Sequence, residues 1–284
     1  MSRACVFCGD TTEKLTREHV YADWISKFFA EHYKQPLTGK IELVAEDGGI
    51  REFPKTPFQH TAKIVCAGCN NGWMSDLEAN VMDNIKRMIL GKPTFLDQAA
   101  QRRLATWCAK TALVIDRLQP ETRVVPDSHY ADMYQQRAAL RSQFVLVAFR
   151  SLTGKGADAL LGGAIKEPVS NFQVPASWPS GDIESIRQEF AEGRKAYKIT
   201  LIVGNLAALV FGHDLPMTLQ VNSSRPLAKG IWPVSPGFFW ESKLSVDKIG
   251  GIPAFHAAFA PGANGPRKLP AALLGGYQPL GRTP

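Results

Sequence analysis

Apolar residues in the N-terminal third of the chain recur at helical spacing in two segments. The first covers residues 20–29, where apolar side chains return every three or four positions. The second begins at Ser75, because Ser75 and Glu78 fit a capping box in which both side chains satisfy N–H groups of the helix end. Gly91 is a plausible end of this helix, since glycine accepts the left-handed conformation that often closes helices. These patterns predict two helices.

The segment between the two helices has a strand-like pattern instead. Residues 41–44 and 50–53 are rich in β-branched and alternating apolar residues, and the acidic, glycine-containing stretch 46–49 separates them. We therefore predict a hairpin over residues 41–53. A further short strand is predicted from Thr61 to Val65.

Beyond Gly91-Lys92-Pro93 the chain continues as a second mixed region, and this tripeptide is the predicted domain joint. We expect domains at 1–92 and 93–284, both within an α+β fold class. The regular segments predicted in the second region are helices at 101–118, 128–141 and 183–192, strands at 144–149 and 159–165, a hairpin over 197–211 that turns at Gly204-Asn205, and short strands at 238–240 and 254–259.

Composition narrows the class of protein. The chain has 284 residues, of which 45% are hydrophobic and 21% charged, as in ordinary globular proteins. No run approaches the roughly 18 apolar residues that a membrane span needs. Residues 1–10 are polar and contain two cysteines, unlike a secretory signal. We expect a cytoplasmic protein with no membrane partner, in which thiols stay reduced.

The net charge of +7 is unevenly distributed along the chain. Residues 1–90 carry 11 basic and 12 acidic side chains, whereas the remaining residues carry 22 and 14. A basic excess favours a polyanionic partner, because each neutralised phosphate releases counterions. A generic basic surface explains the same numbers, so charge alone does not decide between these interpretations.

Cysteine spacing gives the strongest chemical signal. Four of the five cysteines form two C-x2-C pairs, Cys5 with Cys8 and Cys66 with Cys69. Two such pairs in a reducing compartment are typical of a structural zinc site with four thiolate ligands. The 57 residues between Cys8 and Cys66 exceed the spacing of a simple zinc ribbon, so a segment is inserted between the pairs. Cys108 lies on an apolar helix face, where we expect a buried small hydrophobe.

Polar residues beside the cysteine pairs suggest chemistry. Glu18 and His19 follow Cys8 by ten residues, and Asn70 directly follows Cys69. A zinc ion that binds both pairs would bring a carboxylate, an imidazole and a carboxamide toward one place. Metal-assisted phosphodiester hydrolysis needs oxygen ligands for a divalent ion and a base that activates water.

The order C-x2-C, acidic residue and His, then C-x2-C-Asn at a helix start resembles HNH endonucleases, over residues 1–90. The resemblance implies a zinc-stabilised ββα-metal fold, similar to a treble clef, followed by an α+β domain. It implies that His19 is the general base and that Glu18 and Asn70 bind a catalytic divalent ion, which is Mg²⁺, Mn²⁺ or another transition ion. The chain departs from the pattern at Glu18, where Asp is commoner, and at Thr61, which stands where the family has its middle Asn. His60 is the best substitute for that Asn.

Three functional hypotheses remain open at this point. The leading one is a nuclease that cuts DNA, with residues 93–284 binding substrate, a protein partner or a trigger; the resemblance also suggests a role in phage defence. The rivals are a non-catalytic zinc module that grips nucleic acid, and an RNA-directed nuclease. Arg17 and Lys63 flank the predicted site and either hold phosphates or are merely solvated. We interpret Trp24 and Trp73 as core residues, and Lys110 as a snorkelling lysine on an apolar helix.

Overall fold

A computed structural model describes most of the chain, and the account that follows concerns the described residues. These are residues 4–33, 39–44, 50–52, 57–118, 122–152, 162–169, 184, 188–189, 191–215, 219–220, 224–225, 228–249, 251–257 and 278–279.

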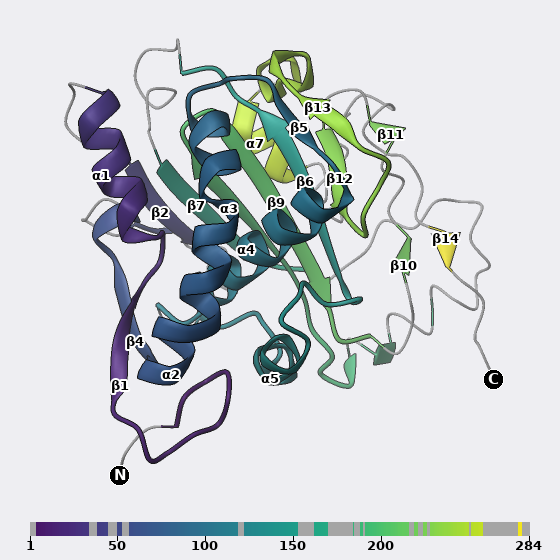
Figure 1. Ribbon diagram of the computed structural model, residues 1–284. Helices are drawn as coiled ribbons and strands as arrows, with labels where there is room; N and C mark the ends of the chain where they lie inside the picture. Colours follow the sequence, from purple (N-terminus) through teal and green to yellow (C-terminus); the bar gives the residue numbers. More distant parts are fainter. Residues whose placement is uncertain are drawn as a thin grey trace.

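An eight-stranded sheet forms the centre of the fold (Figure 1). All neighbouring strands are antiparallel except β2 and β7, which are parallel. The strands, in spatial order, are β11 (Ser224–Arg225), β12 (Ala228–Trp232), β6 (Gln143–Phe149), β9 (Leu206–His213), β8 (Ala196–Val203), β7 (Gly162–Pro168), β2 (Gly39–Val44) and β3 (Ile50–Glu52).

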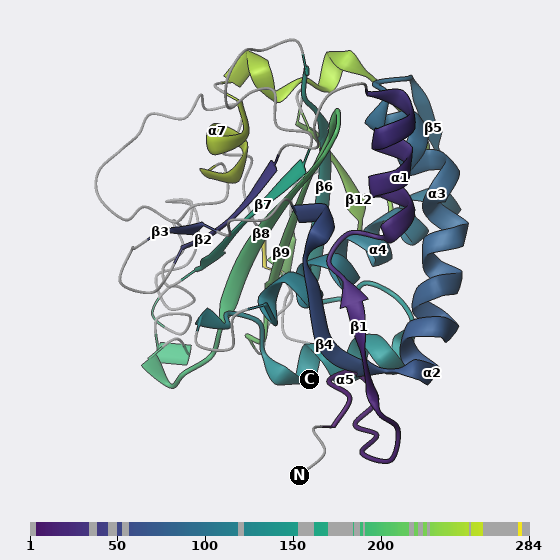
Figure 2. The same ribbon diagram turned by 90° about the vertical axis from the view of Figure 1, so that its left-hand side faces the viewer.

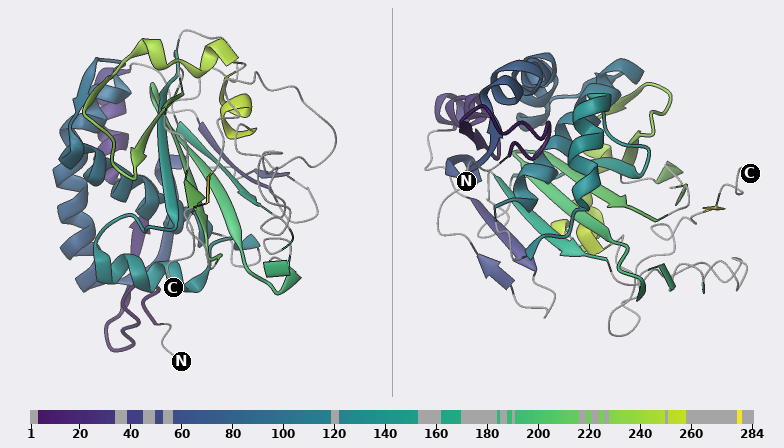
Figure 3. Two further views of the ribbon diagram at one scale, coloured as in Figure 1. Left: turned by 90° about the vertical axis from the view of Figure 1, so that its right-hand side faces the viewer. Right: turned by 90° about the horizontal axis from the view of Figure 1, so that it is seen from below.

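The two faces of this sheet are covered differently (Figures 2 and 3). The near face, as we call it, packs against the longer helices, and the far face packs against α7 (Gly251–Ala257). The contact with α7 includes Phe255, which joins Leu146 and Leu209 in a small separate core. The near-face helices are α1 (Asp23–His32), α3 (Ser75–Ile89), α4 (Gln98–Asp116) and α5 (Asp127–Gln136).

Helix α4 is the central element of the near-face layer. Its residues from Leu104 to Asp116 are all buried, so the helix is enclosed on every side rather than along one stripe. Asp97 caps its N-terminus, with the carboxylate accepting a hydrogen bond from the Ala100 N–H at 2.7 Å. The helix therefore lies between the sheet and the N-terminal elements, where a charged side chain needs a partner.

The N-terminal elements form a strand–strand–helix unit. Strand β1 (Leu15–His19) pairs antiparallel with β4 (Thr61–Cys66), and the chain then turns through α2 (Ala67–Cys69) and a π-helical turn (Asn70–Met74) into α3. The segment between β1 and β4 leaves the unit: it supplies α1, and then β2 and β3, which extend the central sheet. The insertion predicted from the cysteine spacing is thus a structural link to the rest of the fold.

Shorter elements complete the description. Strand β5 (Thr94–Leu96) pairs with β13 (Phe238–Trp240), and β10 (Leu219–Gln220) pairs with β14 (Gln278–Pro279). The 3₁₀ turns are η1 (Pro57–Gln59), η5 (Ser242–Leu244) and η6 (Val246–Ile249). None of the helices in the described ranges has the length and apolar character needed to cross a membrane.

Packing is continuous across the domain boundary predicted at residue 92. One buried apolar cluster extends from Cys5 to Leu244. The Tyr21 hydroxyl donates a 2.5 Å hydrogen bond to the Gly163 carbonyl of β7. At the β8–β9 turn, Gly204 has a φ of +58° and lies so close to Ile89 that a Cβ would approach its backbone to 2.8 Å. The two predicted domains therefore share a core and a sheet.

Most predicted elements form, but the helix predicted at 128–141 ends at Gln136, and two further predictions are wrong. The mixed α+β class, the 41–44/50–52 hairpin, the strand from Thr61 and the 197–211 hairpin are confirmed. The Ser75 capping box is wrong, because the chain is already helical at Met74, the N-cap residue, and no side chain caps it. The strand predicted at 254–259 is also wrong, since residues 251–257 form α7. Most of the helix predicted at 183–192 lies outside the described residues.

Candidate metal centre and the residues around it

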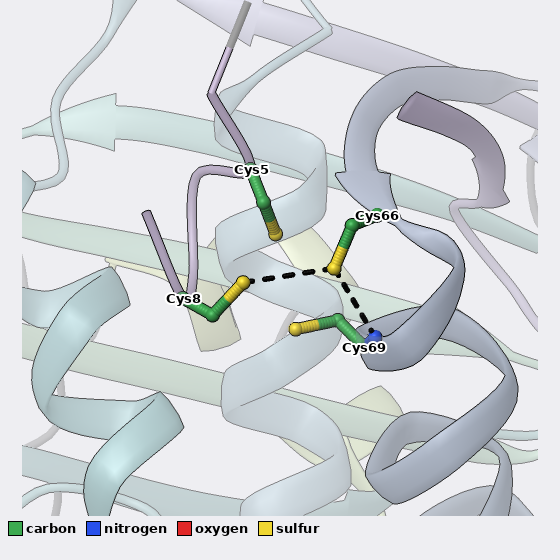
Figure 4. A group of neighbouring side chains, drawn as sticks. All are labelled: Cys5, Cys8, Cys66 and Cys69. Carbon is green, nitrogen blue, oxygen red and sulfur yellow. Dashed lines mark hydrogen bonds between the residues drawn. The ribbon is translucent and has the colours of Figure 1, made fainter. Parts of the chain in front are cut away.

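Four cysteine side chains converge at the end of the β1–β4 unit (Figure 4). Their Sγ atoms, from Cys5, Cys8, Cys66 and Cys69, all lie within 4.8 Å of one another. The Cys8 and Cys66 sulfurs are 3.6 Å apart. Tetrahedral zinc with Zn–S bonds of about 2.3 Å requires sulfurs about 3.8 Å apart, whereas a disulfide requires about 2.05 Å. The four thiols are free and could bind a structural metal ion.

Local backbone geometry brings the two pairs together. Gly9, with a φ of +76°, closes the first pair, and its N–H donates to the Cys5 carbonyl at 2.9 Å. The Val6 N–H donates to the Ile64 carbonyl at 3.0 Å, so this loop is attached to β4. At the second pair, the Cys69 N–H donates to the Cys66 sulfur at 3.4 Å. Backbone N–H groups directed at sulfur stabilise the thiolate form that a metal binds.

The thiols differ in acidity. Burial raises the pKa of Cys66 to about 11. For Cys5, burial also acts to raise the pKa, but backbone hydrogen bonds from Cys8 and Cys66 outweigh it and the pKa is lowered. A bound cation would favour the thiolate at every position, because it offsets the cost of burying negative charge.

Aromatic packing attaches the cysteine cluster to the rest of the protein. Phe7, between the two cysteines of the first pair, is buried and makes edge contacts with Trp73 and Tyr130 at ring-centroid distances of 5.6 and 5.5 Å. Trp73 lies in the π-helical turn and Tyr130 lies on α5. The interpretation of Trp73 as a packing residue agrees with these contacts, since it is half-buried against the main core.

Glu18 points into the protein toward α4. Its side chain is 5% exposed, and its Oε1 accepts a hydrogen bond from the Lys110 Nζ at 2.8 Å. The same ammonium donates to Oε1 of Glu78 on α3, also at 2.8 Å. Burial opposes the charged form of Lys110, but the two carboxylates outweigh burial and raise its pKa above the usual value. The snorkelling interpretation of Lys110 is wrong, because its side chain is fully buried.

His19 lies on the opposite face of β1. After a register shift between Thr16 and Arg17, Glu18 pairs with Ala62 on the buried face, while His19 pairs with Thr61 on the outward face. Because neighbouring residues of a strand point to opposite sides, the imidazole and the Glu18 carboxylate diverge. His19 is half-buried.

The outward face also carries two basic residues. Arg17 and Lys63 are exposed and are direct cross-strand partners. Like charges in this position repel one another, and the repulsion is relieved when an anion lies between them. Because side chains alternate along each strand, both cations lie on the same side of the β1–β4 ribbon as His19.

Asn70 and His60 lie close to β1 through different groups. The Asn70 Nδ2 donates to the Thr16 Oγ1 at 3.0 Å and to the Arg17 carbonyl at 3.4 Å, so its carboxamide joins the helix start to the strand. His60 is half-buried at the start of β4, and its carbonyl accepts a hydrogen bond from the Val20 N–H at 3.0 Å. All four predicted residues thus lie on or next to the β1–β4 ribbon, but His19 and His60 are at the end where His19 pairs with Thr61, whereas Asn70 contacts β1 toward the cysteine end, and the side chains of Glu18 and His19 diverge.

Among the described residues, no cluster of ligand atoms around Glu18 and His19 matches the cysteine cluster. In the described part of the chain, groups of three or more close His, Cys, Asp or Glu ligand atoms are formed by the four cysteines and by Asp10, Glu13 and Cys66. Neither group contains Glu18 or His19. The assignment of Glu18 and Asn70 as ligands of a catalytic ion remains a prediction.

Sequence reasoning identified the cysteine cluster but missed the partners of Glu18. Lys110 was visible as a lysine within an apolar helical stretch, and Glu78 was assigned to a capping box. The missing signal is their spatial proximity, which depends on α3 packing along α4.

Comparisons of the chain with protein-family models, with curated proteins and with solved structures gave no match.

Proposed function

We propose that the protein is a zinc-stabilised nuclease of the HNH type that hydrolyses phosphodiester bonds in DNA, with His19 activating the attacking water. The cysteine cluster would hold a structural zinc ion, for which four thiolates are the typical ligand set. This proposal rests on the residue pattern Glu18-His19 and Cys69-Asn70 within a strand–strand–helix unit.

One observation carries the proposal: His19 lies on the outward face of the β1–β4 ribbon beside the cross-strand cations Arg17 and Lys63. A general base must reach a water molecule next to the scissile phosphate. Two adjacent basic residues on the same face attract that phosphate and stabilise the negative charge that develops during hydrolysis. These groups supply a base and an electrophilic surface without rearrangement of the ribbon.

The positions of Glu18 and Asn70 do not suit the catalytic divalent ion that the HNH resemblance leads us to expect. Oxygen ligands suit Mg²⁺ or Mn²⁺, but Lys110 already donates to one oxygen of the Glu18 carboxylate. That carboxylate also points away from the face that carries His19. Residues Glu18 and Asn70, as they lie, do not fit the family's ligand set beside His19, and we derive no step through such an ion.

Nicking of supercoiled plasmid DNA tests the proposal. We expect wild-type protein with Mg²⁺ or Mn²⁺ to nick the plasmid, and His19→Ala to lose at least about 100-fold in rate, the usual contribution of a general base. His32→Ala is the matched control, because His32 lies at the exposed end of α1 and its ring contacts the Phe28 carbonyl. Equal nicking by wild type and His19→Ala would overturn the role of His19. Parallel RNA substrates separate a DNA-directed from an RNA-directed enzyme.

A paired substitution tests Glu18 separately. Glu18→Gln and Glu78→Gln each remove one carboxylate from Lys110, so their effects on the ion pair are alike. If Glu18 binds a catalytic metal, Glu18→Gln alone raises the Mg²⁺ or Mn²⁺ concentration needed for half-maximal nicking. If its role is limited to Lys110, the two variants behave alike in this titration.

A non-catalytic zinc module that binds nucleic acid is the second candidate function. The burial of Glu18 against Lys110 favours it, because an ion-paired, buried carboxylate has a structural use that needs no metal. Absence of nicking over a full range of metals and substrates, together with retained binding of DNA or RNA, would support this alternative over the nuclease.

A further inference from the structure

Arg137 occupies an unusual position at the C-terminal end of α5. It is the C-cap residue, and its φ of +52° and ψ of +31° are left-handed. Helices usually place glycine or asparagine where this conformation is needed, because other L-residues are strained in it. In the described part of the chain it is the only non-glycine residue with positive φ. Arginine is thus present at a position where the backbone conformation favours glycine or asparagine.

The Arg137 guanidinium contacts two aromatic rings. Its Cζ lies 3.9 Å from the ring centroid of Tyr134 and 4.9 Å from that of Trp73. Tyr134 comes from the preceding turn of α5, and Trp73 comes from the π-helical turn after the second cysteine pair. The cation lies over both rings, a position in which a guanidinium can still donate hydrogen bonds through its N–H groups.

The guanidinium has no carboxylate partner within the described ranges, although Arg137 is exposed. Two arginines near the start of α5 differ in this respect: Arg117, at the end of α4, and Arg123, just before α5, both form ion pairs with Asp127. An arginine that is positioned by two aromatic rings and has no carboxylate partner among the described residues can donate hydrogen bonds to phosphate oxygens.

The position of the stack connects it with the candidate site. Trp73 is on the same turn as Asn70, whose carboxamide contacts β1. Phe7, between Cys5 and Cys8, packs against the edge of Trp73. Helix α5 and α2 lie at the same end of the molecule in Figure 1. The metal-binding cysteines therefore support the ring on which the guanidinium lies.

We propose that Arg137, in contact with Trp73 and Tyr134, is a phosphate-binding residue that contacts the backbone of a nucleic acid. The choice of nucleic acid as ligand rests on the proposed function. A phosphodiester accepts hydrogen bonds from two N–H groups in one plane, and its charge pairs with the unpartnered cation. This binding role explains why the position keeps an arginine despite its left-handed backbone.

Fluorescence anisotropy with labelled 20-base-pair DNA, single-stranded DNA and RNA tests the proposal on the full chain. We compare the wild type with Arg137→Gln and with Arg103→Gln, which removes the same charge from an exposed arginine on α4. One lost phosphate contact lowers the salt-dependence slope by about 0.9, so Arg137→Gln is expected to weaken binding roughly eightfold at 0.1 M salt. Arg103→Gln is expected to change affinity by less than about twofold. Equal losses in both variants, or no binding of any probe by the wild type, would overturn the proposal.

Arg137→Gly separates binding from structure. Glycine accepts the left-handed conformation, so we expect the melting temperature to stay unchanged or to rise by about 2 °C, while affinity falls as in Arg137→Gln. A clear fall in melting temperature with unchanged affinity would show that the stack serves stability alone, and would overturn the proposal. Arg137→Lys keeps the charge but loses the planar stack, and recovery of less than half of the lost affinity is expected.

Nicking and affinity measured on the same variants distinguish failure of this inference from failure of the proposed function. His19→Ala is expected to bind like the wild type. Loss of affinity in Arg137→Gln in the absence of any nicking supports Arg137 as a binding residue and contradicts the nuclease. Nicking that depends on His19 but not on Arg137, with affinity unchanged in Arg137→Gln, supports the nuclease and contradicts the phosphate contact.

Discussion

Two buried lysines, one on each side of the central sheet, are stabilised to different degrees. On the near face, Lys110 is fully buried and has two carboxylate partners at 2.8 Å, Glu18 and Glu78. On the far face, Lys198 of β8 is 1% exposed, and its Nζ lies 2.9 Å from Oε2 of one carboxylate, Glu167, whose side chain is 36% exposed. Both side chains are removed from water to a similar extent, so the difference lies in their partners.

The pKa values shift in opposite directions as a result. Burial acts to lower the pKa of both lysines, because it disfavours the ammonium form. For Lys198 burial outweighs the single, partly exposed Glu167 and the pKa is lowered. For Lys110 the two carboxylates outweigh burial and the pKa is raised. The β1–β4 unit and α4 are thus joined through a buried lysine with two carboxylate partners, while the far face contains a buried lysine with a single, partly exposed partner.

Loss of the metal is the largest perturbation expected on the near face. Cys66→Ser removes one of four converging thiols, and structural zinc contributes about 10 kcal/mol or more to the folding of small zinc domains. We expect Cys66→Ser, or chelator treatment of the wild type, to abolish cooperative unfolding of the near-face layer as monitored by tryptophan fluorescence. Metal content measured on the purified protein is expected to fall from about one zinc per chain to none.

Cys108→Ser provides the control for this prediction. Cys108 is fully buried on α4 but lies outside the group of converging thiols. Its replacement is expected to cost about 1–3 kcal/mol, through burial of a hydroxyl, without changing metal content. Equal zinc loss in both variants would contradict the assignment of the four ligands.

Replacing each lysine with methionine measures the difference between the two charge clusters. Lys110→Met leaves two carboxylates next to a buried apolar side chain, and we expect a cost of about 3–5 kcal/mol in the free energy of unfolding. Lys198→Met leaves Glu167 partly exposed and still bonded to the His256 Nε2 at 3.0 Å. We expect its effect to stay within about 1 kcal/mol. Urea unfolding of both variants gives the two values.

A rescue variant checks the physical reason. If unpaired carboxylates cause the loss in Lys110→Met, adding Glu18→Gln and Glu78→Gln should recover at least about half of it, because neutral amides cost less to bury than charges. A triple variant that is no more stable than Lys110→Met would show that lost packing of the lysine chain is the cause.

Local signals explain which parts of the fold the sequence could predict. The β8–β9 hairpin follows from two apolar runs around Gly204-Asn205, and the convergence of the cysteines follows from their paired spacing. By contrast, the mostly apolar residues 254–259 also fit a strand, and the packing of residues 251–257 as α7 depends on the far face of the sheet. Propensity is overridden there by tertiary contacts.

The residues of the candidate site could be predicted from the sequence, but the directions of their side chains could not. Glu18 and His19 were identified as a pair from their sequence position, yet adjacent residues on a strand point to opposite sides. The register shift between Thr16 and Arg17 decides which of the two is buried, and no local pattern indicates a shift of this kind. Lys110, the partner that holds Glu18, lies 92 residues away in sequence.

The smallest expected effect is the acid sensitivity of the far-face cluster. Burial opposes ionisation of Glu167, but hydrogen bonds from His256 and Lys198 outweigh it and lower its pKa to about 2, from 4.5 in an unperturbed side chain. A lowered pKa in the folded state contributes stability above the unfolded value, and this contribution is lost as pH falls from about 4.5 toward 2. Because Glu167 is about one-third exposed, we expect a loss of only about 0.5 kcal/mol between pH 6 and pH 4.

Urea unfolding of the wild type and Glu167→Gln at both pH values measures this loss. Acid effects elsewhere, such as protonation of the cysteine cluster, act equally on both proteins, so the difference between their losses reports on Glu167 together with its partners Lys198 and His256. The wild type should lose more stability than Glu167→Gln as the pH is lowered. Equal losses would mean that Lys198 and His256 give the Glu167 carboxylate no net stabilisation. The difference in stabilisation between this cluster and the one at Lys110 would then be larger than the contacts of Glu167 indicate.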